Sequence, residues 1–578
     1  MAKRILRLIN KEIGSINQAA FLLGLFALLA QFLGLIRDRL LVHFLGPGLE
    51  LDIYYAAFRV PDLIFVSIAS LFAITALLPS LNLKIGRDTN GELNTDAPKN
   101  AQKFFSDVFT VFLVTIILIC ALAFLLMPFL TKLIAPGFDG EALEQVTYLS
   151  RIMLLSPILL GFSNLFGSIT QLFRKFFVFA LSPFFYNLGI IIGIILLYPF
   201  IGIPGLALGV VLGALLHFGV NIPVVIRHRF LPYFSRAIDW QGIKNLVKLS
   251  LPRTLGLALY SIAFLVIVAI ASTMGEGSVS ILNLSFNIHA VPITIIGLSY
   301  SVAAFPSLAR YFSVQDIESY IRQIGLAAKQ IIFWSLPVTF LFIVLRAQII
   351  RVILGTSNFS WENTRLAAAM FALFSISVVA QSLNTLFVRA FYAGGKTRRP
   401  LLVNIFSLFL IVGLSFIFLY VFKAVPEIKT FFESLLRVKG LPGTELMAIG
   451  LGYSIGIICN FFLLWRFFRR DFTLAKNLDF LGRVFWQSLL GALTIAAVAY
   501  GLLGVFDNIF DINTFYGIFM QGFLAGILGI AGGVVVLHLL KNQELLDVWQ
   551  TVRSKFWKIK AISPEQSRRM VAPPQEKL

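Results

Sequence analysis

The sequence predicts an all-α integral membrane protein with about fourteen transmembrane helices. Of its 578 residues, 58% are hydrophobic and only 13% are charged, and the mean hydropathy is +0.87. Soluble globular proteins are roughly 45–50% apolar and about 25% charged. Apolar runs near the ~20 residues that a membrane-spanning helix needs recur along the chain. These features exclude a soluble enzyme, a coiled coil and a disordered chain, and they argue against a porin-type barrel, whose strands alternate apolar and polar residues.

The apolar runs and the turn signals between them place the individual helices, with boundaries good to a few residues. The predicted ranges are 17–43, 53–81, 105–130, 147–172, 178–199, 204–226, 250–273, 279–308, 330–353, 366–389, 400–422, 446–466, 484–505 and 515–540.

The distribution of basic residues supports this helix count. The two termini and the alternate loops that share their side hold 35 of the 48 Lys and Arg residues, whereas the loops on the other side hold 9. Cytoplasmic loops carry an excess of Lys and Arg. The split therefore predicts an even number of spans with both termini in the cytoplasm. It also accounts for the net charge of +20 without a nucleic-acid partner.

Two pairs of similar segments indicate an internal repeat. Residues 74–82, ITALLPSLN, resemble residues 301–309, SVAAFPSLA, and a Pro-x-x-x-Asn pattern begins a predicted helix at Pro183–Asn187 and again at Pro400–Asn404. Proline at a helix start costs little, because its missing N–H would be unpaired there anyway. One match alone therefore indicates only a helix start, but the ordered matches at similar offsets favour two parallel six-helix lobes.

The predicted organisation follows from this repeat. It consists of a cytosolic N-terminus (1–16), an N-lobe (17–228), a C-lobe (229–470), a further pair of helices (471–540) and a cytosolic basic tail (541–578). The tail is expected to form an amphipathic helix followed by a disordered end. Its basic residues either contact anionic lipids or are simply solvated; they are Lys555, Lys558 and Lys560.

The first two predicted helices carry most of the charges at membrane depth. Such a charge costs about 2.5–3.5 kcal/mol on insertion scales, so it usually faces a cavity or a partner. At 100° per residue, one face of the second helix carries Asp52, Tyr55, Arg59 and Asp62. Arg37 and Asp38 lie in the first helix. This polar stripe indicates either a substrate cavity or a structural Arg–Asp network. In the eighth helix, Asn283 and Asn287 are spaced i, i+4, as is typical of hydrogen bonds between helices.

The sequence offers few signs of covalent or metal chemistry. It contains no Walker loop, nucleophile elbow, HExxH motif or paired catalytic carboxylates. Cys120 and Cys459 lie far apart in apolar runs, and the histidines lack metal-ligand spacing. We therefore expect a protein that is not an enzyme, with no catalytic residues, no cofactor and no metal. Because no ATP-binding motif is present, transport would be driven by an ion or voltage gradient or by consumption of the product.

Ordered motifs from about residue 15 to residue 505 resemble the MurJ (MviN) family. The most specific are LGLIRD at Leu33–Asp38 and DIYYAAFRVP at Asp52–Pro61. Further matches are Leu78–Leu81, Ala135–Phe138, Pro183–Asn187, Leu251–Pro252, Pro292, Phe305–Leu308, Phe391–Ala393, Lys396–Thr397 and Pro400. Each piece alone is weak, whereas the ordered set is fairly specific.

The resemblance implies a flippase of the MOP (MATE-like) superfamily in the bacterial inner membrane. Such a protein moves lipid II, the undecaprenyl-pyrophosphate-linked peptidoglycan precursor, from the inner to the outer leaflet by alternating access. Its two lobes enclose a cationic cavity, and helices 13 and 14 form a groove for the lipid tail. A monomer is the expected state, and cell-wall synthesis proteins are further candidate partners. We expect Arg37 and Arg59 to bind the headgroup with Asp38 and Asp52 orienting them, and the predicted substrate-binding set also includes Asp62 and Asn287.

Three positions depart from the family pattern. Gln31, Phe65 and Asn287 stand where the family usually has basic residues of the cavity. The cavity is therefore less cationic, and this leaves open a flippase for another polyprenyl-linked glycan, such as an O-antigen or capsule unit. A MATE-like cation-coupled exporter is a further alternative, although an exporter of organic cations favours acidic cavity residues. A membrane scaffold without transport is the last alternative.

Overall fold

Every regular element that the structure describes is a helix. The computed structural model describes residues 16–69, 71–72, 77–78, 80–81, 97–472 and 480–557. Residues 1–15 of the expected cytosolic N-terminus, five of the nine residues of the repeat segment 74–82 and the end of the tail from residue 558 lie outside these residues. In chain order the first-half elements are α2 (Ile16–Leu45), α3 (Leu49–Ala57), α4 (Arg59–Ile64), η1 (Phe65–Ala69), α6 (Ala97–Ile134), α7 (Gly140–Met153), α8 (Leu155–Leu172), α9 (Phe176–Ile192), η2 (Gly193–Leu197), α10 (Tyr198–Ile201), α11 (Ile203–Gly219) and α12 (Ile222–Arg227).

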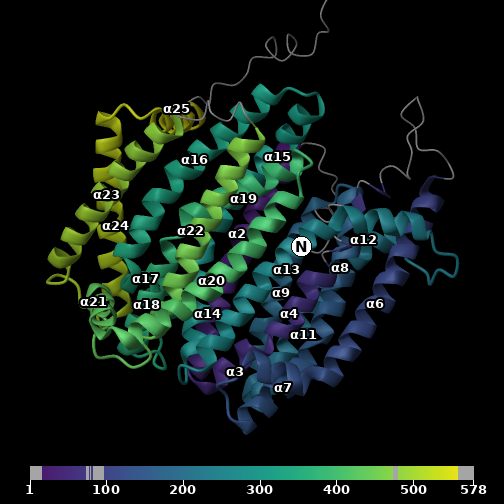
Figure 1. Ribbon diagram of the computed structural model, residues 1–578, viewed down its shortest axis with the longest axis horizontal. Coiled ribbons are helices and arrows are strands. Elements are labelled where there is room, and N and C mark those ends of the chain that lie inside the picture. The colour runs from purple at the N-terminus through teal and green to yellow at the C-terminus, as the bar shows by residue number, and fades with distance from the viewer. Residues whose placement is uncertain are drawn as a thin grey trace, which may run out of the picture.

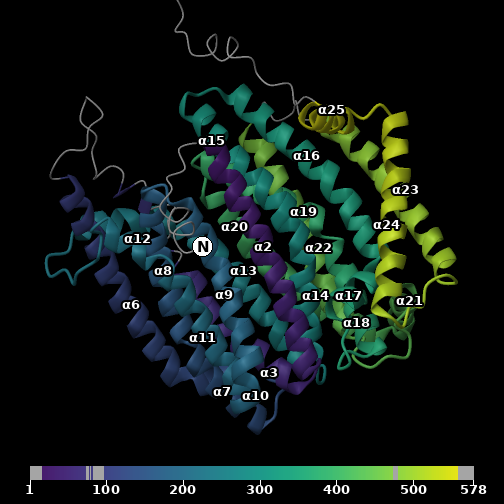
Figure 2. The ribbon, with the colours of Figure 1, turned by 180° about the vertical axis from the view of Figure 1, so that it is seen from behind.

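The second half continues the bundle in the same manner (Figures 1 and 2). Its elements are α13 (Trp240–Ser272), α14 (Ser278–Pro292), η3 (Ile293–Leu298), α15 (Ser299–Ser313), α16 (Ile317–Val344), α17 (Arg346–Leu354), α18 (Trp361–Ser375), α19 (Val378–Ala393), α20 (Arg398–Ala424), α21 (Pro426–Leu436), α22 (Leu446–Asp471), α23 (Phe480–Phe506), α24 (Phe515–Leu539) and α25 (Gln543–Trp557).

The all-helical membrane fold is confirmed. Within the described residues, eleven helices are long and apolar enough to cross a membrane, and the pair α18 and α19, bent by 43°, makes a twelfth candidate. The first two predicted spans correspond to α2 and to the interrupted run of α3, α4 and η1, which are not among these twelve. Each of the fourteen predicted helices therefore has a helical counterpart, although the second one is broken rather than continuous.

The second predicted helix breaks at Phe58, between α3 and α4. Pro61 lies in the first turn of α4, where its missing N–H needs no partner. The π-helical turn η1 follows directly. Such turns insert an extra residue into a helix and are common at functional sites. Phe58 itself keeps helical backbone angles, with φ at -68° and ψ at -25°, so the interruption between α3 and α4 is confined to one residue.

Two asparagines of the predicted repeat make equivalent contacts. Asn187 of α9 donates from Nδ2 to the carbonyl oxygen of Ala30 in α2 at 3.2 Å. Asn404 of α20 donates from Nδ2 to the carbonyl oxygen of Gly256 in α13 at 3.5 Å. In each predicted lobe, an asparagine of the fifth helix, one turn after the proline, thus donates a hydrogen bond to the backbone of the first helix. The π-helical turns η1 and η3 also stand at corresponding places in helices 2 and 8.

The last helices lie on one flank of the bundle. Both views show α23 and α24 side by side next to α16 and α17, at the edge opposite α6 (Figures 1 and 2). The short helix α25 lies across the end of α24 (Figure 1). Its Glu544 carboxylate is 3.6 Å from the Lys329 ammonium of α16. The predicted helix at the start of the tail is therefore present as α25.

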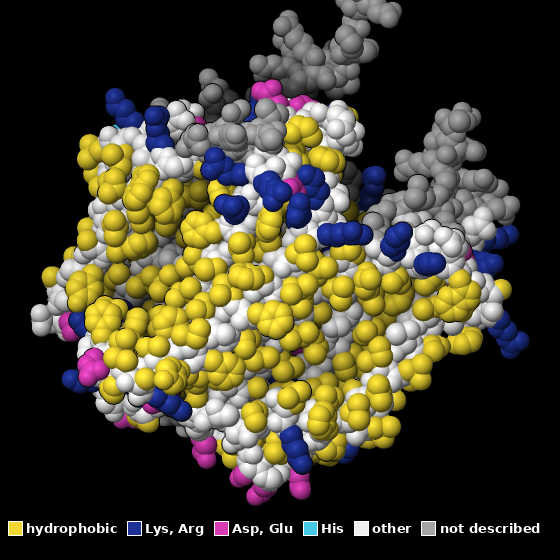
Figure 3. All heavy atoms as spheres, in the orientation of Figure 1, with side chains coloured by type: hydrophobic (Ala, Val, Ile, Leu, Met, Phe, Trp, Pro, Cys, Tyr) yellow, Lys and Arg dark blue, Asp and Glu magenta, His cyan; other side chains and the backbone are white. Residues whose placement is uncertain are grey.

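The surface of the molecule matches a bilayer environment. On the face shown in Figure 3, a broad band of hydrophobic side chains crosses the middle, and Lys and Arg side chains gather along the edge near α12 and α25. Asp and Glu side chains are more frequent along the opposite edge, near α3 and α7 (Figure 3). Large exposed apolar side chains on α6, such as Leu118 and Phe129, belong to this band. By the positive-inside rule, this charge asymmetry is the one expected of a protein whose α12 and α25 edge faces the cytoplasm.

We predict that cysteine labelling in intact cells will report this orientation. In a background with Cys120 and Cys459 replaced by serine, cysteines at Gly48 and Glu276 should react with an impermeant maleimide from outside, and a cysteine at Arg398 should not. Gly48 has open space around its Cβ position, so the substitution fits. External labelling at Arg398 in intact cells would contradict the predicted topology, and permeabilised cells provide the control for reactivity.

Candidate functional site

A polar cavity of about 280 Å³ lies between the first three described helices and α13 and α14. It brings together residues that are more than two hundred positions apart in the chain. Its lining consists of Arg37, Leu41, Tyr54, Tyr55, Phe58, Arg59, Asp62, Tyr260, Ser261, Phe264, Asn283, Phe286 and Asn287. The cavity therefore contains four of the six predicted site residues, which are Arg37, Arg59, Asp62 and Asn287.

Arg37 is held in place by a hydrogen-bond network that joins three helices. Its Nε and Nη2 donate to Oδ1 of Asp38 at 2.9 and 2.7 Å. Its Nη1 donates to Oδ1 of Asn187 in α9 at 3.1 Å. The second carboxylate oxygen of Asp38 accepts from Nδ2 of Asn287 in α14 at 3.0 Å. Asp38 is only 1% exposed whereas Arg37 is 21% exposed, so the buried carboxylate orients a guanidinium that reaches the cavity.

Arg59 has a different set of partners. Its Nη2 donates to Oδ1 of Asn283 in α14 at 2.8 Å, and its Nε donates to the carbonyl oxygen of Tyr55 at 3.1 Å. Its guanidinium also lies over the ring of Phe264 in α13, 5.0 Å from the ring centroid. The described hydrogen-bond acceptors of Arg59 are neutral oxygens, so its positive charge is less compensated by its contacts than that of Arg37.

Asp52 does not belong to the cavity, and the structure corrects its predicted role. Its side chain is fully buried, and its two carboxylate oxygens accept from the backbone N–H groups of Gly277 at 2.8 Å and Ser280 at 2.6 Å. It therefore caps the N-terminus of α14, where a negative charge is favourable. Asp52 and Arg59 nevertheless both contact α14, Asp52 at its N-terminus and Arg59 through Asn283. Asn283, rather than Asp52, orients Arg59.

Most of the aromatic part of the cavity was not predicted; only Tyr55 was placed on the predicted polar face of the second helix. Tyr54 and Tyr55 come from α3, and Tyr260 and Phe264 come from α13. The hydroxyl of Tyr260 lies 2.6 Å from that of Tyr453 in α22. Such residues give no signal in the sequence, because 14% of the chain is aromatic. The spacing of Asn283 and Asn287 did indicate polar contacts between helices, and these contacts are the ones made to Arg59 and Asp38.

The cap at Asp52 is one of several ties between the two predicted lobes. Arg39 of α2 donates to the carbonyl oxygens of Val352 and Ile353 at the end of α17, at 2.7 and 3.2 Å. Asn358 donates to the carbonyl oxygen of His43 at 2.7 Å. These ties lie where α2 ends and α3 begins, which is the edge that we predict to face outward. The cavity is therefore bounded on that side by polar contacts between the lobes.

The three positions that depart from the family pattern fall in two groups. Gln31 and Phe65 are half-buried and are not among the residues that line the cavity. Asn287 does line it and donates to Asp38 instead of adding a charge. Among the described lining residues, the positive charges are those of Arg37 and Arg59 and the negative charge is that of Asp62. The guanidinium groups suit an anionic ligand, because their planar fork matches phosphate oxygens.

Comparisons with known proteins agree with this geometry. The family model described as lipid II flippase MurJ matches residues 41–521. A probable lipid II flippase MurJ of Rickettsia prowazekii is 25% identical over 449 residues, which is 77% of this chain and 83% of that protein. Its counterpart in Haemophilus influenzae is 24% identical over 519 residues, which is 83% of this chain and 98% of that protein.

Solved structures with the same fold come from two transporter families. A lipid II flippase MurJ in an inward closed conformation has a TM-score of 0.70 at 20% identity, and covers 91% of this chain and 100% of its own. An inward-facing multidrug resistance MATE family transporter of the MOP superfamily has a TM-score of 0.59 at 17% identity, and covers 78% of this chain and 96% of its own. Because the family model spans most of the sequence, the chain belongs to the lipid II flippase MurJ family of multi-pass membrane transporters, which are not enzymes.

Proposed function

We propose that this protein moves lipid II from the inner to the outer leaflet of the bacterial inner membrane by alternating access. The observation that carries the proposal is the cavity that holds Arg37 and Arg59 at membrane depth. Lipid II couples a pyrophosphate–sugar headgroup to a long polyprenyl chain. A charged headgroup needs polar partners to cross the apolar core, whereas the chain remains soluble in lipid.

The two arginines have distinct roles in this proposal. Arg37 already shares its fork with the Asp38 carboxylate, so an incoming phosphate must compete with that carboxylate. Arg59 donates its hydrogen bonds to neutral oxygens. A phosphate oxygen can replace them, because a charged oxygen is the stronger acceptor. We therefore infer that Arg59 makes the main pyrophosphate contact and that Arg37 supports it. Asp38, Asn187 and Asn283 position the two guanidinium groups.

Asp62 and Asn287 complete the proposed site at its border. Asp62 is an exposed carboxylate that lines the cavity one turn after Arg59. It repels phosphate and attracts the hydroxyl and amide groups of a sugar or peptide. Asn287 lines the cavity and donates to Asp38, so it links α14 to the Arg37 pair. Asp52 is assigned outside the binding site, as part of the contact between the lobes.

Alternating access would move residues 17–228 against residues 229–470 as two lobes. The contacts that must break for the outward-facing edge to open include the Asp52 cap on α14 and the bonds from Arg39 to α17. Hydrogen bonds to a charged group contribute about 1.5–3 kcal/mol each. Such contacts hold the outer side closed until substrate binding or the membrane potential offsets them.

The reduced number of basic residues supports a second candidate substrate. Asn287 lies in the cavity where the family usually carries a basic residue, so the headgroup meets two arginines. A flippase for another polyprenyl-pyrophosphate-linked glycan has the same anionic group and needs the same arginines. The two candidates differ in the sugar and peptide that the rest of the cavity accommodates.

The remaining expectations concern the setting of the protein in the cell. We propose that it acts as a monomer in the cytoplasmic membrane with both termini inside, and that cell-wall synthesis proteins consume its product. The basic edge near α12 and α25 fits this orientation (Figure 3).

The main test combines a cellular and a purified assay. Expression of the chain should restore growth to a bacterium depleted of its own lipid II flippase. Purified protein in proteoliposomes should expose fluorescent lipid II to an external reagent faster than empty vesicles do. Faster flipping of an O-antigen-type lipid, together with failure to restore growth, would select the second candidate. Flipping of neither lipid would refute the proposal.

We predict that charge reversal at Arg59 abolishes transport. Arg59→Glu should lower the flipping rate by about tenfold or more, because it replaces charge-assisted hydrogen bonds of about 1.5–3 kcal/mol with repulsion. Arg59→Lys keeps the charge and loses only the bidentate fork, so its loss should be a few-fold. The matched control is Arg322→Glu, an exposed arginine on α16. Normal flipping by inserted Arg59→Glu protein would show that Arg59 is structural.

We also predict that Asp52→Asn loosens the contact between the lobes. An asparagine oxygen carries no charge, and it replaces only one of the two oxygens that bind the N–H groups of Gly277 and Ser280. A cysteine at buried Ser278 on α14 should then react several-fold faster with an impermeant maleimide. Glu50→Gln on the same helix, α3, is the control, because Glu50 is exposed. An unchanged labelling rate at Ser278 would disprove this closing role of Asp52.

A further inference from the structure

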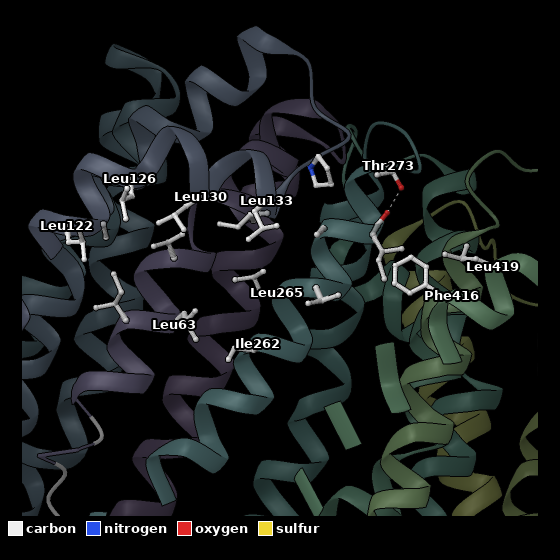
Figure 4. A pocket seen from close by; sticks show the side chains of 18 of the residues that line it. Leu63, Leu122, Leu126, Leu130, Leu133, Ile262, Leu265, Thr273, Phe416 and Leu419 are labelled. Atoms are coloured by element: carbon white, nitrogen blue, oxygen red, sulfur yellow. Dashed lines mark hydrogen bonds between the residues drawn. The ribbon is translucent and has the colours of Figure 1, made fainter. Parts of the chain in front are cut away.

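A second and larger hollow lies beside the polar cavity. Its volume is about 1020 Å³, and it is formed by α4, α6, α13 and α20 (Figure 4). The view shows leucines of α6 facing Leu63 of α4 and Leu265 of α13, with Phe416 and Leu419 of α20 at the far side (Figure 4). We call this hollow the apolar groove. Of the described residues that line it, Lys423 is the only charged one.

The apolar groove follows the C-terminal halves of α6, α13 and α20. On α6 it begins at Ile119, the middle of the helix, and ends at Pro136, just past its last residue. On α13 it runs from Ile262 to Thr273, and on α20 from Phe416 to Lys423, so it follows the same end of each helix. By the predicted topology this end faces outward. Lys423 then sits at the depth of the outer-leaflet headgroups.

The groove and the polar cavity share two helices as a common wall. On α4, Arg59 and Asp62 line the cavity while Val60 and Ile64 line the groove. On α13, the cavity residues Tyr260, Ser261 and Phe264 alternate with the groove residues Ile262, Leu265 and Val266. A lipid whose headgroup leaves the cavity on the outer side can therefore keep its chain against the same helices.

We infer that the apolar groove holds the isoprenoid chain of the transported lipid on the product side, with the pyrophosphate near Lys423. This inference rests on the proposed function. The apolar lining suits a hydrocarbon chain, and the cation at the outer end is complementary to the phosphate that begins it. The groove is separate from the one that the resemblance assigns to the last two helices. In Figures 1 and 2, α6 lies at the opposite edge of the bundle from α23 and α24.

Photo-crosslinking from adjacent positions on α6 tests where the chain lies. Leu126 lines the groove and is 45% exposed, whereas its neighbour Leu125 is 73% exposed and is not a lining residue. A benzophenone amino acid at either position is placed at the same depth in the membrane. In proteoliposomes with radiolabelled lipid II, we expect several-fold more lipid adduct at position 126 than at position 125. Equal adducts at the two positions would overturn the inference.

The same experiment identifies the lipid in the groove. Labelled phosphatidylglycerol is used as the alternative probe in parallel vesicles. Preferential capture of the phospholipid at position 126, without the polyprenyl lipid, would overturn the inference in favour of an ordinary phospholipid site. The flipping rate is measured in parallel vesicles that contain the wild-type protein. If flipping is normal but position 126 gives no more lipid adduct than position 125, the inference about the groove is rejected and the proposed function stands. If no flipping occurs, the proposed function is rejected.

Filling the groove provides a second, independent test. Ala123 is a buried lining residue of α6, and Ala121 is an exposed residue two positions away. Ala123→Trp should lower both the adduct at position 126 and the flipping rate several-fold, while Ala121→Trp leaves both unchanged. Lys423→Gln should reduce the adduct for lipid II and leave that for a neutral diacylglycerol probe unchanged. Full flipping and full adduct in a well-inserted Ala123→Trp protein would contradict the inference.

Discussion

The fold around the site depends on how a buried carboxylate is neutralised at membrane depth. Asp38 is 1% exposed and takes hydrogen bonds from Arg37 on its own helix and from Asn287 on α14. Arg37 in turn reaches Asn187 on α9. Removing one member leaves an uncompensated charge in a medium that solvates it poorly, which costs far more than the pair contributes. The packing of α2 against α9 and α14 is thus fixed by the need to satisfy this pair.

Much of this architecture could be predicted from the sequence, because its signals are local or additive. Apolar runs, loop charges and the Pro-x-x-x-Asn repeats predicted the helices, and Asn187 and Asn404 make equivalent contacts. The site was harder to predict, since a shared helix face does not tell which group on a neighbouring helix each side chain contacts. Asp52 accepts hydrogen bonds from the N-terminus of α14, a partner that lies 225 positions away in the sequence. Asn283 lies 224 positions from Arg59, so the sequence around the arginine does not indicate this partner.

The repeat is symmetrical in its backbone and asymmetrical in its charges. The π-helical turns η1 and η3 occupy corresponding places, yet the first lobe carries Arg37, Asp38, Arg59 and Asp62 at membrane depth. The partners that α14 offers to these charges are neutral amides, namely those of Asn283 and Asn287. A ligand can replace a neutral asparagine as the partner of a charged side chain without leaving a second charge unpaired. In the proposed transport cycle, separation of the lobes would break the hydrogen bond between Asn287 and Asp38 and would keep the Arg37–Asp38 pair together.

The common wall of α4 and α13 gives the two hollows a mechanical connection. Arg59 and Asp62, three positions apart, lie on one side of α4, and Val60 and Ile64, four apart, lie on another. A short helix cannot rotate or tilt without moving both sides. The break at Phe58 and the turn η1 bound α4 at its two ends, where the regular hydrogen-bond ladder is interrupted and bending is easiest. In the proposed mechanism, a movement of α4 that released the headgroup from Arg59 would also reshape the wall against which the chain packs, so headgroup release and chain repositioning would occur together.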